Sequence, residues 1–441
     1  MLIRAHLMQT PTRYRLESRV VLVAVDDDGL ITGVEAAESV GAVDLDIDLG
    51  PDRVLLPGLI DTHLHAPQWP QLGTGLGLPL EEWLFKYTFP LERQLTDPVF
   101  AAEVWPAMVS TLLEHGTTTV AYYATVSVET TTMLAQACAE LGQRAFVGRV
   151  AMDHPDNTPY WYRDADAAMG VAASQRSIDE IRALNSSLVA PIITPRFAPA
   201  CTDELLSGLG ALAAETGSAV QTHCSESDWE HNYAFQRFGC SDTEALDLFE
   251  LVREHTVLAH GDHLGDGDLD IIRAAGAGVA HCPLSNSYFG NAVLAARKLL
   301  DRGVRIGLGS DVAGGAQPGL LPQAAHAVTV SGMLEDGVDS AIAAGERGVP
   351  GSRLTMLDAF WMATVGGADL LGLPVGLIEP GRRFDALAVD VGRERSPLRR
   401  WDGLDNVDRL FEKIVQLATP ADISYVWVDG RQVAGTSSPE R

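Results

Sequence analysis

The sequence is poor in cysteine, and its cysteines are not arranged to bind metal. Five cysteines are scattered over 441 residues, and none forms a Cys-x-x-Cys pair. The odd number and the wide spacing argue against a disulfide framework and a thiolate zinc site, and they favour reduced thiols. The first residues also lack the apolar core and cleavage pattern of a signal peptide. We therefore expect a cytoplasmic protein.

Basic residues are scarce as well. Lys and Arg together number 32, against 59 Asp and Glu, so the formal net charge is −27. This surplus of negative charge disfavours nucleic acid and anionic membranes as partners, because both are polyanions. No stretch approaches the roughly 20 consecutive apolar residues that a membrane helix needs. We expect neither a nucleic-acid partner nor a membrane partner.

The middle of the chain alternates between short apolar segments and helical ones. The helices predicted over 98–115 and 128–141 are each followed by a glycine, and Thr202 is a suitable N-cap for a helix over 203–215. Eight such repeats predict a (β/α)8 TIM-like barrel, an α/β fold. An open doubly wound sheet fits the strand count less well, and no Gly-x-Gly-x-x-Gly follows the first strand. The predicted strands are 54–61, 117–124, 144–150, 188–197, 219–223, 256–260, 278–282 and 305–310.

Both ends of the chain carry β-strand signals. Residues 15–25 are rich in strand-forming residues, and 385–390 and 423–428 have a similar pattern. We expect the two ends to form one small β-sandwich domain. The predicted division is 1–56 for its first part, 57–384 for the catalytic barrel, and 385–441 for its second part and a C-terminal tail.

The predicted strands end in polar residues, and in a barrel of this kind the active site lies at those ends. His63 and His65 are two residues apart, so in a strand both imidazoles face one side. Such a pair alone is a weak signal for metal. Three imidazoles and one carboxylate, however, make a divalent metal site with an open position for water. The further strand-end candidates are His223, His260 and Asp311, whereas we expect His281 to support the site.

Glu226 follows His223 by three residues. A carboxyl group there, partly removed from water, could hold a proton near neutral pH and move it to a substrate. The alternative is a solvated glutamate in a loop. Its place beside a predicted metal ligand favours the catalytic role.

Several of these motifs resemble the amidohydrolase superfamily, whose members are metal-dependent hydrolases on a (β/α)8 barrel. The superfamily motifs are residues 57–66, His223, His260 and Ser310-Asp311. More narrowly, the chain resembles the guanine deaminases of that superfamily. The segments that carry this likeness are 65–68, 78–84, 86–90, 142–148, 194–197, 223–226, 280–283, 285–286, 307–315 and 383–386.

The resemblance implies a reaction and a role for each residue. Guanine and water would give xanthine and ammonia, in purine catabolism, in a homodimer. One zinc ion, with iron(II) as the alternative, would be bound by His63, His65, His223 and Asp311, and His260 would lie beside the metal-bound water. Glu226 would protonate the purine ring, and Asp311 would take the proton of the attacking water. Gln68 and Arg196 would bind polar edges of guanine, and Phe197 would pack on its ring.

Two other interpretations remain at this point. The chain could be another deaminase or a dehalogenase of the same superfamily, acting on cytosine, a triazine, an adenosine-like nucleoside or a pterin. Gln68 and the pair Arg196-Phe197 argue against this, although Arg196 could also form a surface salt bridge. The chain could instead be a non-catalytic scaffold, but such a protein should have lost metal ligands, and none is missing here.

Overall fold

A computed structural model describes residues 1–39 and 43–435. Eight strands, all paired in parallel, form a closed barrel, because β11 pairs with both β10 and β12. A short strand, β9 (Val150–Ala151), continues from β8 and also pairs with β10. The predicted (β/α)8 barrel is confirmed. Its strands are β6 (Leu59–His65), β7 (Thr117–Tyr123), β8 (Arg144–Gly148), β10 (Val189–Pro195), β11 (Ala219–Cys224), β12 (Val257–His260), β13 (Gly278–His281) and β14 (Arg305–Leu308).

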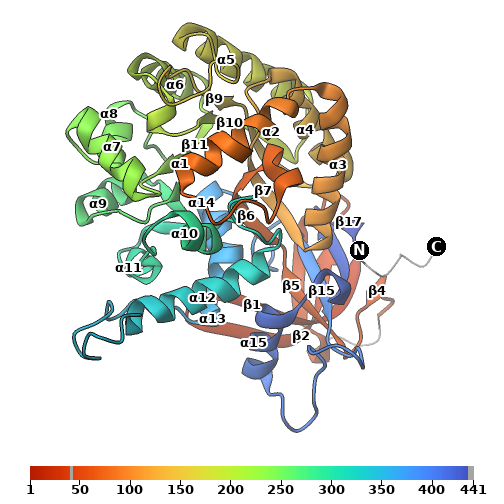
Figure 1. Ribbon diagram of the computed structural model, residues 1–441. Helices are drawn as coiled ribbons and strands as arrows, with labels where there is room; N and C mark the ends of the chain where they lie inside the picture. Colours follow the sequence, from red (N-terminus) through yellow and green to blue (C-terminus); the bar gives the residue numbers. More distant parts are fainter. Residues whose placement is uncertain (40–42, 436–441) are drawn as a thin grey trace.

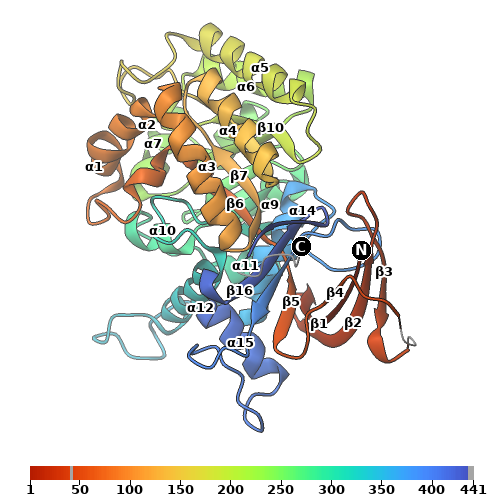
Figure 2. The same ribbon diagram turned by 90° about the vertical axis from the view of Figure 1, so that its right-hand side faces the viewer.

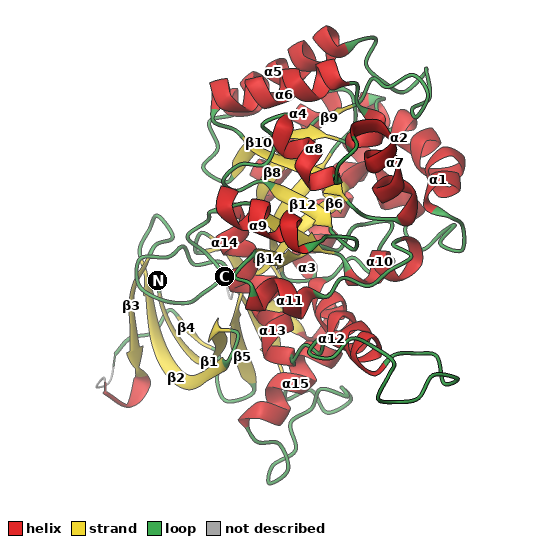
Figure 3. Ribbon diagram, turned by 90° about the vertical axis from the view of Figure 1, so that its left-hand side faces the viewer, coloured by secondary structure: helices red, strands yellow, loops and turns green. Residues whose placement is uncertain are grey.

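The barrel strands lie at the centre of this part of the molecule, and helices surround them (Figures 1 and 3). The predicted helix ends are close to those observed, because capping residues fix them: Asp97 and Thr202 accept hydrogen bonds at N-termini, and Gly142 adopts a left-handed conformation. The helices are α1 (Leu80–Trp83), α2 (Phe89–Gln94), α3 (Pro98–Glu114), α4 (Val128–Leu141), α5 (Ala167–Ala183), α6 (Asp203–Thr216), α7 (Asp228–Phe238), α8 (Asp242–Leu248), α9 (Asp266–Ala275), α10 (Pro283–Phe289), α11 (Ala296–Asp301), α12 (Leu320–Asp336), α13 (Met356–Trp361), α14 (Gly367–Leu371) and α15 (Val407–Leu417).

Strands from both ends of the chain form a separate mixed sheet beside the barrel (Figure 2). Its order is β17-β16-β15-β5-β1-β2-β3, with β4 paired to β1. The N-terminal and C-terminal strands meet where β5 pairs antiparallel with β15. The strands are β1 (Leu2–Thr12), β2 (Arg15–Val25), β3 (Ile31–Ala36), β4 (Ile47–Asp48), β5 (Arg53–Pro57), β15 (Ala386–Asp390), β16 (Ile423–Val428) and β17 (Arg431–Ala434).

The first predicted strand, 54–61, is wrong as a single element. The chain passes from one sheet to the other at Gly58, so that β5 belongs to the end sheet and β6 to the barrel. Gly58 donates its backbone N–H to the carbonyl of Asp385, and a side chain at this position would collide with Thr118. Both strands are almost wholly buried, so their sequences form one mainly apolar run. The hydrophobic pattern therefore does not mark where one strand ends and the next begins.

The two sheets are also joined by buried ion pairs. Arg144, at the start of β8, donates to Asp385 from Nε (2.9 Å) and Nη2 (3.1 Å), and Nη2 also donates to Asp429 (2.6 Å). Since β5 ends at Pro57 and β15 begins at Ala386, we propose the division 1–56, 57–384 and 385–441. Residues 436–441 of the expected tail lie outside the described part. Within that part, no helix combines the length and apolarity needed to cross a bilayer.

Candidate active site

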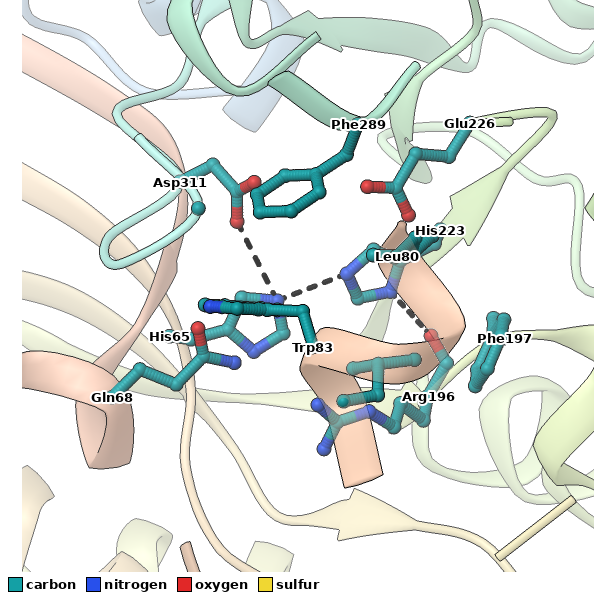
Figure 4. A pocket seen from close by; sticks show the side chains of 12 residues that line it. His65, Gln68, Leu80, Trp83, Arg196, Phe197, His223, Glu226, Phe289 and Asp311 are labelled. Atoms are coloured by element: carbon teal, nitrogen blue, oxygen red, sulfur yellow. Dashed lines mark hydrogen bonds and ion pairs between the residues drawn. The ribbon is translucent and has the colours of Figure 1, made fainter. Parts of the chain in front are cut away.

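Three histidines and one aspartate from three barrel strands meet at the carboxyl end of the barrel. His65 Nε2 lies 2.9 Å from His223 Nε2 and 3.6 Å from Asp311 Oδ1 (Figure 4). The same Asp311 oxygen is 3.1 Å from His63 Nε2. His63 and His65 end β6, His223 lies on β11, and Asp311 follows β14. The four residues named as metal ligands are therefore neighbours in space, although up to 248 positions separate them.

The state of these imidazoles suits a metal. Burial lowers the pKa of His63, His65 and His223 well below the usual value, and the neighbouring histidines lower it further, so the rings are neutral. The Nδ1–H of His223 donates to the backbone carbonyl of Arg196 (2.6 Å), which leaves Nε2 as an electron-pair donor. Both ring nitrogens of His63 are buried without a hydrogen-bond partner. A divalent cation beside Asp311 would satisfy the Nε2 atom of His63, so the residues fit the expected group.

His260 and Glu226 lie next to this cluster. The Nδ1–H of His260 donates to Asn286 Oδ1 (2.9 Å), so its Nε2 is unprotonated. That atom is buried without a hydrogen-bond partner and is 3.6 Å from Glu226 Oε1. Burial, followed by the nearby Asp311 carboxylate, raises the pKa of Glu226 well above its ordinary value. Burial therefore favours the protonated form of Glu226, which borders the same cavity as Asp311.

A small cavity lies over the cluster. Trp83 on α1 and Phe289 at the end of α10 lie across it, with their ring centroids 4.9 Å apart, and Leu80 lies beside them (Figure 4). These buried side chains form an apolar cover on one side of the cavity. A bound molecule would lie between this apolar cover and the polar cluster.

The three residues predicted to bind substrate also line the cavity: Gln68, Arg196 and Phe197. Arg196 immediately follows β10, and its side chain is 2% exposed, so it does not form a surface salt bridge. Phe197 packs within 6.1 Å of the His223 ring, measured between centroids. The structure therefore brings every predicted site residue to one place.

His281 is at the end of β13, as predicted. It is buried, and burial lowers its pKa to about 3. It is absent from the residues that line the cavity and from the groups of potential metal ligands in the described part. This position agrees with the expected supporting role.

Sequence reasoning missed Glu92. This residue on α2 is fully buried and binds both polar residues of the cavity wall: it accepts from Arg196 Nη1 (2.6 Å) and Nη2 (3.0 Å) and from Gln68 Nε2 (2.9 Å). Glu92 lies only two residues beyond the segment 86–90 that carried the family likeness. A glutamate in the first turn of a short helix is usually solvated, so the sequence alone gave no sign of this contact.

Asp61 was missed for a similar reason. It is a carboxylate in the middle of β6, where an apolar residue is expected, and it is fully buried. Its Oδ1 accepts from the backbone N–H of Ser310 (2.9 Å) and of His63 (3.2 Å). Asp61 thereby holds together the two strand ends that carry His63 and Asp311. A charged residue within an apolar strand was the signal that could have identified it.

Comparison with known proteins places this site in a family. The pattern that describes the Amidohydrolase family matches residues 54–433. A guanine deaminase from Dictyostelium discoideum is 35% identical over 423 residues, which cover 95% of this chain and 88% of that protein. The chain belongs to the guanine deaminases of the amidohydrolase family.

Two further members of the family show the same relationship. The guanine deaminase of Homo sapiens is 35% identical over 398 residues, covering 89% of this chain and 85% of its own. The crystal structure of a guanine deaminase from C. acetobutylicum superimposes with a TM-score of 0.87 at 28% identity, covering 98% of this chain and 99% of that chain. That structure holds guanine in its active site. The predicted family membership is confirmed.

Proposed function

We propose that this protein converts guanine and water to xanthine and ammonia with the help of one divalent metal ion. The observation that carries the proposal is the buried Glu226 beside the three-histidine, one-aspartate cluster, at a cavity walled by Arg196 and Gln68. The membership in the guanine deaminases supports guanine as the substrate. We infer a hydrolase that acts on the C–N bond of a cyclic amidine.

The metal would be held by His63, His65, His223 and Asp311. Zinc suits this donor set, and iron(II) is the alternative in this superfamily. When bound, such an ion would act as a Lewis acid that lowers the pKa of water. Hydroxide, which can attack a carbon, would then form at neutral pH. Retention of all four donors supports an active enzyme over a non-catalytic scaffold.

The remaining steps fall to side chains of the chain itself. Arg196 and Gln68 would bind the polar edges of guanine, and Phe197 would pack against its ring. Asp311 would accept the proton of the attacking water, and His260 Nε2, which faces Glu226, would hold that water in place by a hydrogen bond. Glu226 would donate its proton to the ring nitrogen next to the amino-bearing carbon. The carboxylate so formed would take up a proton released by the attacking water and pass it to the departing ammonia.

The test is a guanine turnover assay by absorbance, with metal analysis of the purified chain. We expect about one divalent ion per chain, conversion to xanthine, and loss of activity with a chelator. His63→Ala should lose metal and activity together. Full activity in metal-free protein would contradict the mechanism, and ammonia release from a pterin, triazine or cytosine in preference to guanine would contradict the substrate.

We also propose a cytoplasmic enzyme that works as a homodimer. The location is supported by its thiols: all five cysteines are free, and four of them are buried. The dimer is supported by the family resemblance, and light scattering on the purified chain would test it. A monomer at working concentration would contradict the dimer while leaving the reaction unaffected.

A further inference from the structure

Glu92 sits behind the cavity wall and is not one of the residues that line it. It is fully buried, and its carboxylate binds the guanidinium of Arg196 through both oxygens. Buried ion pairs of this kind are weak contributors to stability, since an apolar pair of similar volume often serves as well. Stability alone therefore does not explain why a charged pair stands directly behind a substrate cavity.

The geometry shows what Glu92 does to the two residues in front of it. A two-point contact fixes the plane of the guanidinium, which single hydrogen bonds do not. Two of the five N–H bonds of Arg196 point at Glu92, so the carboxylate occupies only part of the guanidinium. The amide of Gln68 is held on both sides, because Nε2 donates to Glu92 (2.9 Å) and Oε1 accepts from the Ala313 N–H (3.1 Å). One carboxylate thus orients both groups that would bind a base.

The same contact cancels a charge. A lone buried arginine would attract any anion of suitable shape, whereas the Arg196–Glu92 pair carries no net charge. Guanine is neutral near pH 7. Xanthine loses a ring proton at mildly alkaline pH, so the proposed product is more acidic than the substrate.

We propose that Glu92 is the positioning residue that makes this cavity select uncharged bases, by fixing Arg196 and Gln68 and by neutralising the arginine. The inference rests on the proposed function in taking a purine as the ligand. It predicts two separable effects of Glu92: one on the orientation of the hydrogen-bond donors, and one on the charge that a ligand meets.

The experiment compares the metal-loaded full-length protein with Glu92→Gln. Turnover of guanine gives KM and kcat. Titration calorimetry at mildly alkaline pH gives the affinities for xanthine, which is largely an anion there, and for hypoxanthine, which is largely neutral. In E92Q we expect KM for guanine to rise roughly tenfold to hundredfold, with a smaller fall in kcat. The preference for xanthine over hypoxanthine should increase at least about tenfold, because the arginine is no longer neutralised.

Two further variants separate orientation from charge. Glu92→Asp keeps the charge but shortens the reach, so KM should rise without the new preference for the anion. In the double variant E92Q/R196Q no unpaired charge is buried, so the anion preference should vanish while KM stays high. If E92Q is too unstable to purify, KM for guanine in E92D and in the double variant still tests the inference. An unchanged KM in both would overturn it.

Asp385→Asn is the matched control. Asp385 also forms a buried two-point pair with an arginine, Arg144, but at the opposite end of the barrel. D385N should lower stability without changing KM or the ligand preference. Wild-type KM and ligand preference in E92Q would overturn the inference. Absence of guanine turnover in the wild type, with the E92Q shift in purine affinity still present, would instead overturn the proposed reaction alone.

Discussion

Glu226 differs from Asp311, the other acid that lines the cavity, in having no role as a metal donor in the proposed site. Its Oε1 lies 3.6 Å from His260 Nε2, whereas Asp311 Oδ1 approaches His63 and His65 at 3.1 and 3.6 Å. Burial keeps the pKa of Glu226 high, so it holds a proton at pH values where an exposed glutamate is ionised. Removal of this proton should thus be separable from removal of the metal.

Glu226→Gln provides this separation, because the amide has the size of the acid but cannot deliver a proton. We expect kcat on guanine to fall by at least ~10²–10⁴-fold, the usual contribution of general acid–base catalysis, with metal content unchanged. Metal per chain and kcat, measured on the same preparation, check this. Near-normal kcat would remove Glu226 from the mechanism, and a loss of metal would make it a ligand.

At the residue scale, a site residue can be predicted from the sequence when its own neighbours in the chain mark it. His63, His65, His223 and Asp311 each end a strand or follow one, and the barrel brings strand ends together. Glu92 has no such local signal. Its partners Arg196 and Gln68 are 104 and 24 positions away, and only the packing of α2 against the barrel mouth brings them into contact.

At the scale of a single element, the turn after β11 presents Glu226. Ser225 has a left-handed backbone there, with φ of 52°, which is costly for a residue with a side chain. Two buried acids stabilise the turn: Asp242 Oδ2 accepts from the Ser225 N–H (2.9 Å), and Glu230 Oε2 accepts from the Glu226 N–H (2.7 Å). The remaining side-chain oxygens of the two acids, Glu230 Oε1 and Asp242 Oδ1, are buried without a hydrogen-bond partner.

This pair should make stability depend on pH. Burial raises the pKa of both Glu230 and Asp242 above the ordinary value, so above about pH 4 the folded state binds more protons than the unfolded chain. The free energy of unfolding should therefore fall as pH rises from about 4 through the raised pKa values. Asp242→Asn should reduce that fall by about 1–3 kcal/mol, as measured by denaturant unfolding across pH. An identical slope in wild type and variant would show that this pair of acids has no such effect.

The strand predicted over 54–61 shows what pattern alone misses at this scale. The helices over 98–114 and 128–141 were placed well because caps and glycines mark their ends. β5 and β6, by contrast, form one apolar run, and the change of sheet at Gly58 depends on pairing with β15 and β7, which are distant in sequence. Partners far along the chain decide where such a strand breaks.

For the whole molecule, the barrel and the end sheet are joined by the strand passage at Gly58 and by the Arg144 ion pairs. Arg144 lies at the start of β8, at the end of the barrel opposite to the site. Arg144→Ala would leave Asp385 buried without its partner. We expect the free energy of unfolding to drop by about 3–5 kcal/mol, with kcat and KM for guanine unchanged in the folded protein. A changed KM would mean that the end sheet acts on the cavity.

The long connection between β6 and β7 carries several residues of the cavity wall but none of the proposed metal donors. It carries Gln68, the cover residues Leu80 and Trp83, and Glu92, whereas the proposed metal donors lie on or next to hydrogen-bonded strands. Much of the proposed substrate-binding wall thus lies within residues 66–97, whereas all four proposed metal donors lie outside that range. A lineage could therefore change what it degrades by drift within residues 66–97 while the reaction itself is conserved. For the same reason, a mutant library confined to that segment is a rational starting point for redirecting the enzyme to other heterocycles.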